Sequence, residues 1–439
     1  MARARRLLGR LSGAWWSSLL LALLALFYLF YVVGTLSSRG LFDYMGSDFI
    51  SFRTASEITW QHGFAQVYDL ELQGRQLQIC QAYAAEPGRC AIAPTFYLPA
   101  FVLLFLPLAL LPPVPGFILW TALNLLVLGL YLWRFGHALG LRDRGPLLAM
   151  ALLCGPVFAN WFFGQVSLLM LVCLGEALLA GRRGQEYRLG LWLGGLLLKP
   201  QILLLLLPGL LIGRRFKVLA GLALTSALVL GLSLLLVGPD GLLRFGKLLL
   251  AASGATVAAD PTVSAAMGTT HPEVMINWRA LATNLDSLLP TPLAWGLAIA
   301  GMALTALAGL SLWLRPAAVP SPHFDIALLG TYAASAAITW HAHTNLAAPL
   351  IVLLLLLYAR RALSRAVLQV WFFVPALLFA VAFLSVPAVA HNLAGLSLFA
   401  LNLYLVGWAV WQLWARRPAP AATTTTAGPG REECTDTQV

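Results

Sequence analysis

The chain has 439 residues, of which 60% are hydrophobic and only 10% are charged, and its formal net charge is +11. Apolar runs of about 20 residues, the length needed to cross the hydrocarbon core of a bilayer, recur along nearly the whole sequence. This composition excludes a water-soluble domain. In such a chain the positive charge indicates arginines held on one side of a membrane rather than a nucleic-acid surface.

The first apolar run, residues 15–36, follows an arginine-rich start and lacks a small-residue cleavage site, so a retained helix is predicted instead of a signal peptide. With the N-terminus placed in the cytoplasm, 20 of the 28 Lys and Arg fall in inner loops and termini, and 10 of the 17 acids fall in outer loops. This asymmetry predicts a multi-pass protein with both termini in the cytoplasm.

The first outer segment, residues 37–93, contains a pattern that suits a helix lying along the membrane surface, "SDFISFRTASEITWQ". Cys80 and Cys90 lie ten residues apart in this segment, and a disulfide between them is expected in an oxidising compartment. Residues 94–115 follow, with prolines at 94, 99, 107 and 112. These prolines predict a broken, half-inserted helix and not a full crossing.

The remaining apolar runs complete a prediction of an all-α polytopic membrane protein with about twelve transmembrane helices. Residues 188–212 lie between two basic loops, so they are expected to form two short helices that turn near Lys199 and Pro200. A second long outer segment, residues 238–292, also suits surface helices. One membrane domain is expected over residues 1–415, and residues 416–439 are expected to be a disordered cytoplasmic tail. The predicted crossings are residues 15–36, 116–134, 146–162, 166–181, 188–198, 201–212, 218–237, 293–314, 324–340, 344–358, 366–386 and 393–414.

Nearly all unusual polar residues fall on the outer side of this topology. Polar groups gathered at one mouth of an apolar body are typical of a site that handles a charged headgroup while its lipid tail stays in the bilayer. The group consists of Asp48, Glu57, Gln165, Lys199, His271, Glu273, Asn277, Arg279, His341, His343, Asn345, His391 and Asn392.

The order of motifs resembles the polyprenyl-phosphate-sugar-dependent transferases of the GT-C superfamily, and within it glycosyltransferase family 87, which includes bacterial polyprenol-phosphate-mannose mannosyltransferases. The resemblance covers roughly residues 1–360. It rests on "GSDF", "FYLPAFVLLFLPLALLP", "GQVSLLML", "GLLLKPQILLLLLP" and a Trp-His turn before a Leu-rich span. The resemblance implies a GT-C fold and an inverting transfer of a sugar, mannose or another hexose or pentose, from a polyprenyl-phosphate donor. The acceptor hydroxyl would belong to a glycolipid, polysaccharide or protein.

The family pattern implies that Asp48 is the general base, and the chemistry needs a carboxylate that takes the proton of the attacking hydroxyl. Lys199, with Arg279 or Arg53, is expected to neutralise the departing lipid phosphate. Two structural alternatives stand beside these roles: Asp48 as the N-cap of a helix, and Lys199 as a residue that only reaches to the interface. The other outer-loop acids that could act as the base are Asp43, Glu57 and Asp69.

The histidine turn departs from the family pattern, since it reads Trp340, His341, Ala342, His343 in place of Trp and two adjacent histidines. If this turn is helical, positions i and i+2 do not share a face, so at most one histidine is expected to point into the site. His343 is favoured as a phosphate ligand, and an interfacial histidine bonded to loop backbone is the alternative. Substrate contacts are further expected from Gln165, His341, Asn345 and Glu57, although Glu57 would lie on the helix face opposite Asp48.

The expected location is the plasma membrane of a bacterium, with an extracytoplasmic site. No metal is expected to be required, because no His, Cys or acid cluster has ligand spacing, and no cofactor other than the lipid-linked donor is expected. The main alternative from another class is a transporter or lipid flippase without sugar-transfer chemistry. A receptor or scaffold subunit without catalysis is the second alternative.

Overall fold

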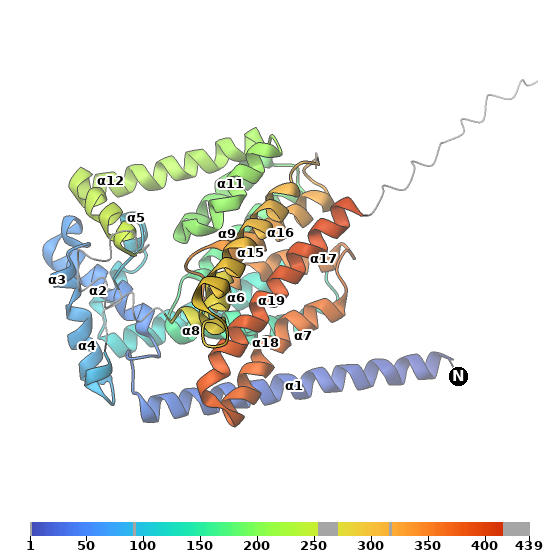
Figure 1. Cartoon of the computed structure of the whole chain (residues 1–439), viewed down its shortest axis with the longest axis horizontal. Coiled ribbons are helices and arrows are strands. Elements are labelled where there is room, and N and C mark those ends of the chain that lie inside the picture. Colours follow the sequence, from blue (N-terminus) through green and yellow to red (C-terminus); the bar gives the residue numbers. More distant parts are fainter. Residues whose placement is uncertain (1, 91–93, 253–270, 316–317, 416–439) are drawn as a thin grey trace, which may run out of the picture.

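The computed structural model describes residues 2–90, 94–252, 271–315 and 318–415. Within these ranges the chain forms helices and loops without a strand, apart from an isolated β-bridge between Gly40 and Ala84 (Figure 1). The prediction of an all-α protein is therefore confirmed. The predicted tail, residues 416–439, lies outside the described residues.

Six helices in the described ranges are long and apolar enough to cross a membrane. The bent pair α7 (Arg144–Leu152) and α8 (Gly155–Phe163), whose axes differ by 51°, adds a seventh span if the two count as one. The six are α1 (Ala2–Ser38), α6 (Pro113–Ala138), α12 (Phe216–Ala252), α15 (Thr291–Ser311), α18 (Arg365–Ser385) and α19 (Pro387–Trp414). Shorter helices are α9 (Ser167–Arg182), α10 (Glu186–Leu193), α11 (Leu203–Ile212), α16 (Pro322–Ile338) and α17 (Leu350–Ala359).

Each of the twelve predicted crossings contains helix, but the number twelve stays a prediction because several of these helices are too short to cross alone. Both ends of the described chain lie at the right of Figure 1, and the helices of the first outer segment lie at the left. These outer helices are α2 (Ser47–His62), α3 (Leu70–Gln73) and α4 (Arg75–Tyr83).

The second outer segment packs on the first. Helix α12 bends at Gly238, which has a φ of 69° and precedes Pro239, and the part after the bend lies against α5 (Pro99–Val102) and the 3-10 turn η1 (Phe64–Gln66) (Figure 1). The proline-rich segment is broken into α5 and η3 (Leu106–Leu110), as its prolines predict. Both long outer segments thus cover the same end of the bundle.

Helices α16 and α17 form the centre of the bundle. Residues 350–357 of α17 are all buried, and so is nearly all of α16. A helix that is apolar on every face is expected inside a bundle, because no face of it is suited to water. Together α16 and α17 pack against α9, α11, α15, α18 and α19.

The outer loop that leads into α2 is fastened by a disulfide and by backbone hydrogen bonds. The structure joins Cys80 and Cys90, in α4 and after the 3-10 turn η2 (Pro87–Arg89), by a disulfide bond. Next to it, the amide of Leu41 donates to the carbonyl of Tyr83 at 3.0 Å, and residues 39 and 85 are joined in the same way at 2.8 Å. The chain that leaves α1 is therefore held in place before it enters α2.

Candidate active site

Asp48 lies at the start of α2. Gly46 precedes the helix in a left-handed conformation (φ 80°, ψ 10°), and its amide donates to the carbonyl of Phe162 at 2.9 Å. Gly46 occupies the N-cap position, so the alternative role of Asp48 as the N-cap is wrong: Asp48 is the second helical residue. At this position the dipole of the helix favours a negative charge on the Asp48 carboxylate.

The "FFGQVS" turn between α8 and α9 brings Gln165 to Asp48. Gly164 has a φ of 78°, and a Cβ atom there would lie 2.4 Å from the Cβ of Phe49 on α2, so this close approach requires glycine. The side chain of Asn160 holds the turn by donating to the backbone carbonyl of Gln165 at 3.1 Å. Gln165 is buried, and hydrogen bonding from its side chain favours the charged form of Asp48 and so opposes the rise in the pKa of that carboxyl.

Lys199 lies at the break between the 3-10 turns η4 (Gly194–Leu198) and η5 (Pro200–Ile202). A residue before proline is forced towards extended backbone, and Lys199 accordingly has a φ of −139° and a ψ of 81°. Short helical segments therefore precede and follow a break at Lys199 and Pro200, as predicted.

The charges of Asp48 and Lys199 act on each other. Burial lowers the pKa of Lys199 to about 8, and the Asp48 carboxylate opposes this shift. Burial raises the pKa of Asp48, whereas the Gln165 hydrogen bond and the Lys199 ammonium oppose that shift. Both side chains are partly exposed to solvent. Burial is nevertheless the largest influence on both pKa values, because protein atoms surround the two charged groups. The two charged groups lie within direct electrostatic reach of each other.

His341 and His343 lie together beside Lys199. Their rings are 4.7 Å apart in an edge-to-face arrangement. The premise that the two histidines lie on a helix is wrong, because α16 ends at Ile338 and residues 341–343 are not helical. His343 itself has extended backbone, and on extended backbone residues i and i+2 share a face. The amide of Gln201, next to the Lys199 turn, donates to the carbonyl of His341 at 3.4 Å.

Both histidines are neutral at pH 7. His341 is exposed to solvent on one side, yet the protein atoms around its ring, with the charges of Lys199 and Arg279, lower its pKa to about 4. Burial, with the neighbouring His341, Lys199, His271 and Arg279, holds the pKa of His343 well below its usual range. The two imidazoles can therefore serve as neutral hydrogen-bonding groups, while Lys199 and Arg279 supply the positive charge.

Arg279 reaches the same group from α14 (Trp278–Leu285). Its guanidinium lies over the ring of Trp340, 4.5 Å from the ring centroid, and it lies near the Trp340 carbonyl at 3.5 Å. The amide of Ile276 donates to the carbonyl of Ala342 at 2.8 Å, and the Asn277 side chain donates to the carbonyl of residue 339 at 2.9 Å. These bonds join the second outer segment to the histidine segment.

Two predicted substrate residues occupy other surroundings. Glu57 forms ion pairs with Arg53 and Arg75, each at 2.8 Å, and these pairs lie beside a hollow between α2, α3 and α4. Asn345 is buried in the 3-10 turn η7 (Thr344–Ala347), which packs against α8, and its Oδ1 atom has no hydrogen-bond partner in the described structure. The structure therefore does not join Glu57 to the Asp48 group.

Tyr97 joins this group, although its role was not predicted from the sequence. Its hydroxyl donates to Oε1 of Gln165 at 3.3 Å, and the Asp48 carboxylate acts on its pKa. Tyr97 lies in the "FYLP" motif, so a polar side chain in an apolar, proline-rich run was the available signal. We use the name Asp48 cluster for Asp48, Tyr97, Gln165, Lys199, Arg279, His341 and His343.

A second set of polar contacts fixes the loop before α2. The hydroxyls of Tyr31 and Tyr44 both lie in hydrogen-bond range of Nε2 of His391, at 3.2 and 3.0 Å. The guanidinium of Arg39 lies over the Tyr44 ring, 5.0 Å from its centroid. This set links the loop that leads to Asp48 with α1 and α19.

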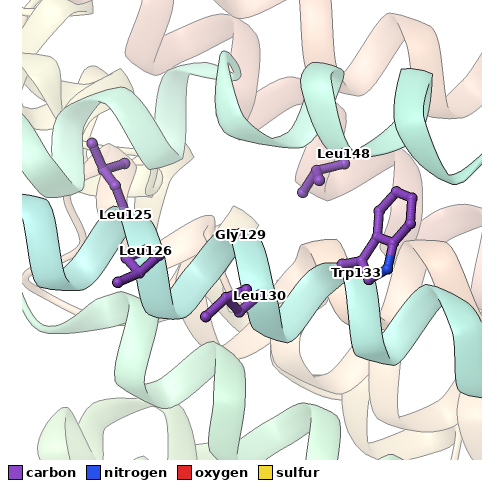
Figure 2. A pocket seen from close by; sticks show the side chains of 6 residues that line it. All are labelled: Leu125, Leu126, Gly129, Leu130, Trp133 and Leu148. Carbon is purple, nitrogen blue, oxygen red and sulfur yellow. The ribbon is translucent and has the colours of Figure 1, made fainter.

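The hollow in Figure 2 is a different feature. It lies along α6 and α7 and is lined by aliphatic side chains and Trp133. Most of these side chains are exposed on a helix long enough to span a membrane, so the hollow suits acyl chains and not polar chemistry. In the described part of the chain, no three His, Cys, Asp or Glu side chains are grouped to hold a metal ion.

A family model provides the comparison that decides the class of the protein. The model of glycosyltransferase family 87 matches residues 95–335, which is more than half of the chain. The chain belongs to glycosyltransferase family 87. No curated protein and no solved structure matches it.

Membership of family 87 establishes a membrane protein that transfers sugars. The matched range contains Tyr97, Gln165, Lys199 and Arg279 of the Asp48 cluster. Asp48 and the two histidines lie outside the match, and their place in the site rests on the geometry described above.

Proposed function

We propose that this family 87 protein is an inverting glycosyltransferase that uses a polyprenyl-phosphate-linked sugar as donor. Support comes chiefly from one observation: the carboxylate of Asp48 and the ammonium of Lys199 lie within electrostatic reach of each other on the same side of the bundle. A carboxylate next to a cation is what a transfer from a lipid phosphate to a hydroxyl requires.

In the proposed reaction, Asp48 takes the proton of an acceptor hydroxyl while the oxygen of that hydroxyl bonds to the anomeric carbon of the donor sugar. The bond between that carbon and the phosphate oxygen breaks from the opposite face, so the configuration inverts. The electron pair leaves with the lipid phosphate, whose charge is neutralised by Lys199 and Arg279. The neutral His341 and His343 donate hydrogen bonds to the phosphate or the sugar. No metal is required in this scheme.

We place the Asp48 cluster on the extracytoplasmic face of a bacterial plasma membrane, with both termini in the cytoplasm. The distribution of Lys and Arg supports this orientation, and so does the shared side of the two chain ends in Figure 1. On that face the donor sugar, mannose or another hexose or pentose, would be transferred to a glycolipid, polysaccharide or protein acceptor.

The experiment that tests this proposal compares Asp48→Asn with Asp69→Asn. Asp69 belongs to the same outer segment and caps α3, accepting bonds from the amides of residues 71 and 72 at 2.9 and 3.2 Å, a role that asparagine fills equally well. With a panel of polyprenyl-phosphate sugars and envelope lipids, scored by mass spectrometry, Asp48→Asn should lower kcat by about 10²- to 10⁴-fold. Asp69→Asn should keep its activity, and equal activity of the two variants would refute the proposed base.

A further inference from the structure

The carboxylate of Asp48 is held by a chain of contacts that returns to its own helix. The Gln165 side chain lies close enough to Asp48 to lower the pKa of that carboxyl by hydrogen bonding, and its Oε1 accepts from the Tyr97 hydroxyl at 3.3 Å. The ring of Tyr97 meets the ring of Phe52 edge to face, with centroids 4.9 Å apart. Phe52 lies one turn after Asp48 on the same face of α2.

The direction of these hydrogen bonds follows from the chemistry of the groups. An ionised carboxylate can only accept, so the Gln165 side chain must turn its NH₂ group towards Asp48. Its oxygen then faces Tyr97, which has to be the donor. Burial, with the nearby Asp48 carboxylate, holds the pKa of Tyr97 well above its usual range, so the phenol keeps the proton that this arrangement needs.

We propose that Gln165 is a positioning residue of the base, which holds Asp48 ionised and oriented, and that the Tyr97 hydroxyl fixes the orientation of the Gln165 amide. This inference rests on the proposed function, and it replaces the predicted role of Gln165 as a substrate contact. The burial of Gln165 agrees with it, because little of this side chain is exposed to a sugar and its oxygen already accepts from Tyr97.

Three variants test the proposal through the pH dependence of kcat/KM. In Gln165→Leu the hydrogen bond that favours the ionised form of Asp48 is lost. The acid limb of the kcat/KM profile, where Asp48 becomes protonated, should therefore move to higher pH, and activity at pH 7 should fall on the order of tenfold. Activity should recover as the pH rises, up to about 8, where Lys199 loses its proton. Gln165→Glu keeps the shape and the bond from Tyr97 but removes the donor, so its shift should be larger. Tyr97→Phe should shift the limb in the same direction by less.

The matched control is Gln369→Leu, the same change at a half-buried glutamine on α18, far along the chain from the cluster. Its acid limb should coincide with that of the native protein. A Gln165→Glu variant with a native acid limb, or a Gln165→Leu variant whose loss is equal at every pH, would overturn the role of Gln165.

An infrared titration separates this inference from the proposed function. The carboxyl band of Asp48 is identified by its absence in Asp48→Asn, and its midpoint should rise in Gln165→Leu without any substrate present. An unchanged midpoint would overturn the positioning role. Retained sugar transfer by Asp48→Asn would instead overturn the proposed base, while a raised midpoint would still establish the hydrogen bond to Gln165.

Discussion

Two opposing influences set the pKa of Lys199, and this pKa predicts how donor binding depends on pH. Burial lowers its pKa to about 8 and the Asp48 carboxylate is what opposes this. A sugar-linked lipid phosphate is a diester that keeps one negative charge throughout this range. Its affinity, measured without acceptor, should therefore fall as the pH rises through about 8 and the ammonium becomes neutral. In Asp48→Asn the opposing charge is gone, so the fall should begin at a lower pH.

Lys199→Gln should bind the donor on the order of 10- to 100-fold more weakly at pH 7, which corresponds to the loss of one charge-assisted hydrogen bond. Its donor affinity should no longer fall as the pH rises through about 8. Lys247→Gln makes the same change at an exposed lysine in the second half of α12 and should leave the binding curve unchanged. A native curve for Lys199→Gln would show that Lys199 does not contact the phosphate.

Single residues show where sequence patterns succeed and where they fail. Asp48 and Lys199 could be selected because a charge in an apolar chain is costly without a partner, and the structure brings them together. The pairing of His341 with His343 could not be predicted, because helical periodicity separates residues i and i+2, whereas residues 341–343 are not helical. Tyr97 was overlooked since nothing in its own motif reveals that Gln165, 68 residues away, is its partner.

At the scale of elements, the contact between the α8–α9 turn and the start of α2 determines where Asp48 lies. Gly164→Ala would place a Cβ atom 2.4 Å from the Cβ of Phe49 and would force a side chain into a left-handed conformation. We expect a loss of roughly 1–3 kcal/mol from overpacking and about 1–2 kcal/mol from the backbone. The variant should unfold at a lower temperature in detergent, and its sugar-transfer activity should fall because Gln165 moves away from Asp48.

Gly155→Ala is the control, at the start of α8, the helix that ends immediately before Gly164. A Cβ atom at Gly155 would have no neighbour within 4 Å, and its φ is not positive, so alanine should be neutral or slightly stabilising there. If Gly164→Ala matched Gly155→Ala in both unfolding temperature and activity, the close approach of the turn to α2 would not be what positions the base.

The elements broken by proline were predictable, whereas their partners were not. Prolines explain both the interrupted segment at residues 99–110 and the turn at Lys199. The sharp bend of α12 at Gly238 falls at the predicted end of a crossing. That the part beyond the bend packs onto α5 and η1 depends on contacts between residues more than 100 positions apart, which periodicity along one helix does not encode.

At the scale of the whole molecule, the hydrophobic pattern predicts where helices occur better than it predicts how many cross the membrane. Helix α17 has only ten residues, all of them apolar except Tyr358, and it is enclosed by neighbouring helices. A short helix of this kind satisfies the same hydropathy rule as a lipid-facing span, because the interior of a bundle is as apolar as lipid. Burial, which decides between the two, is visible only in three dimensions.

The orientation of the molecule can be tested with two single cysteines on opposite sides. Ala65 is exposed in η1, at the end of the bundle that carries the Asp48 cluster, and Gln185 is exposed between α9 and α10. With an extracytoplasmic site, a membrane-impermeant maleimide should label Ala65→Cys in intact spheroplasts. Gln185→Cys should be labelled only after the membrane is permeabilised.

Both substitutions belong in a Cys434→Ser background, because that thiol lies in the tail, whereas Cys154 is buried and Cys173 is half-buried. The background protein itself should stay unlabelled, since Cys80 and Cys90 are joined to each other. The opposite labelling pattern would place Asp48 and Lys199 in the cytoplasm. A lipid-linked donor would then have to present its sugar at the inner face, and the arginine asymmetry that led to the extracytoplasmic assignment would need a different origin.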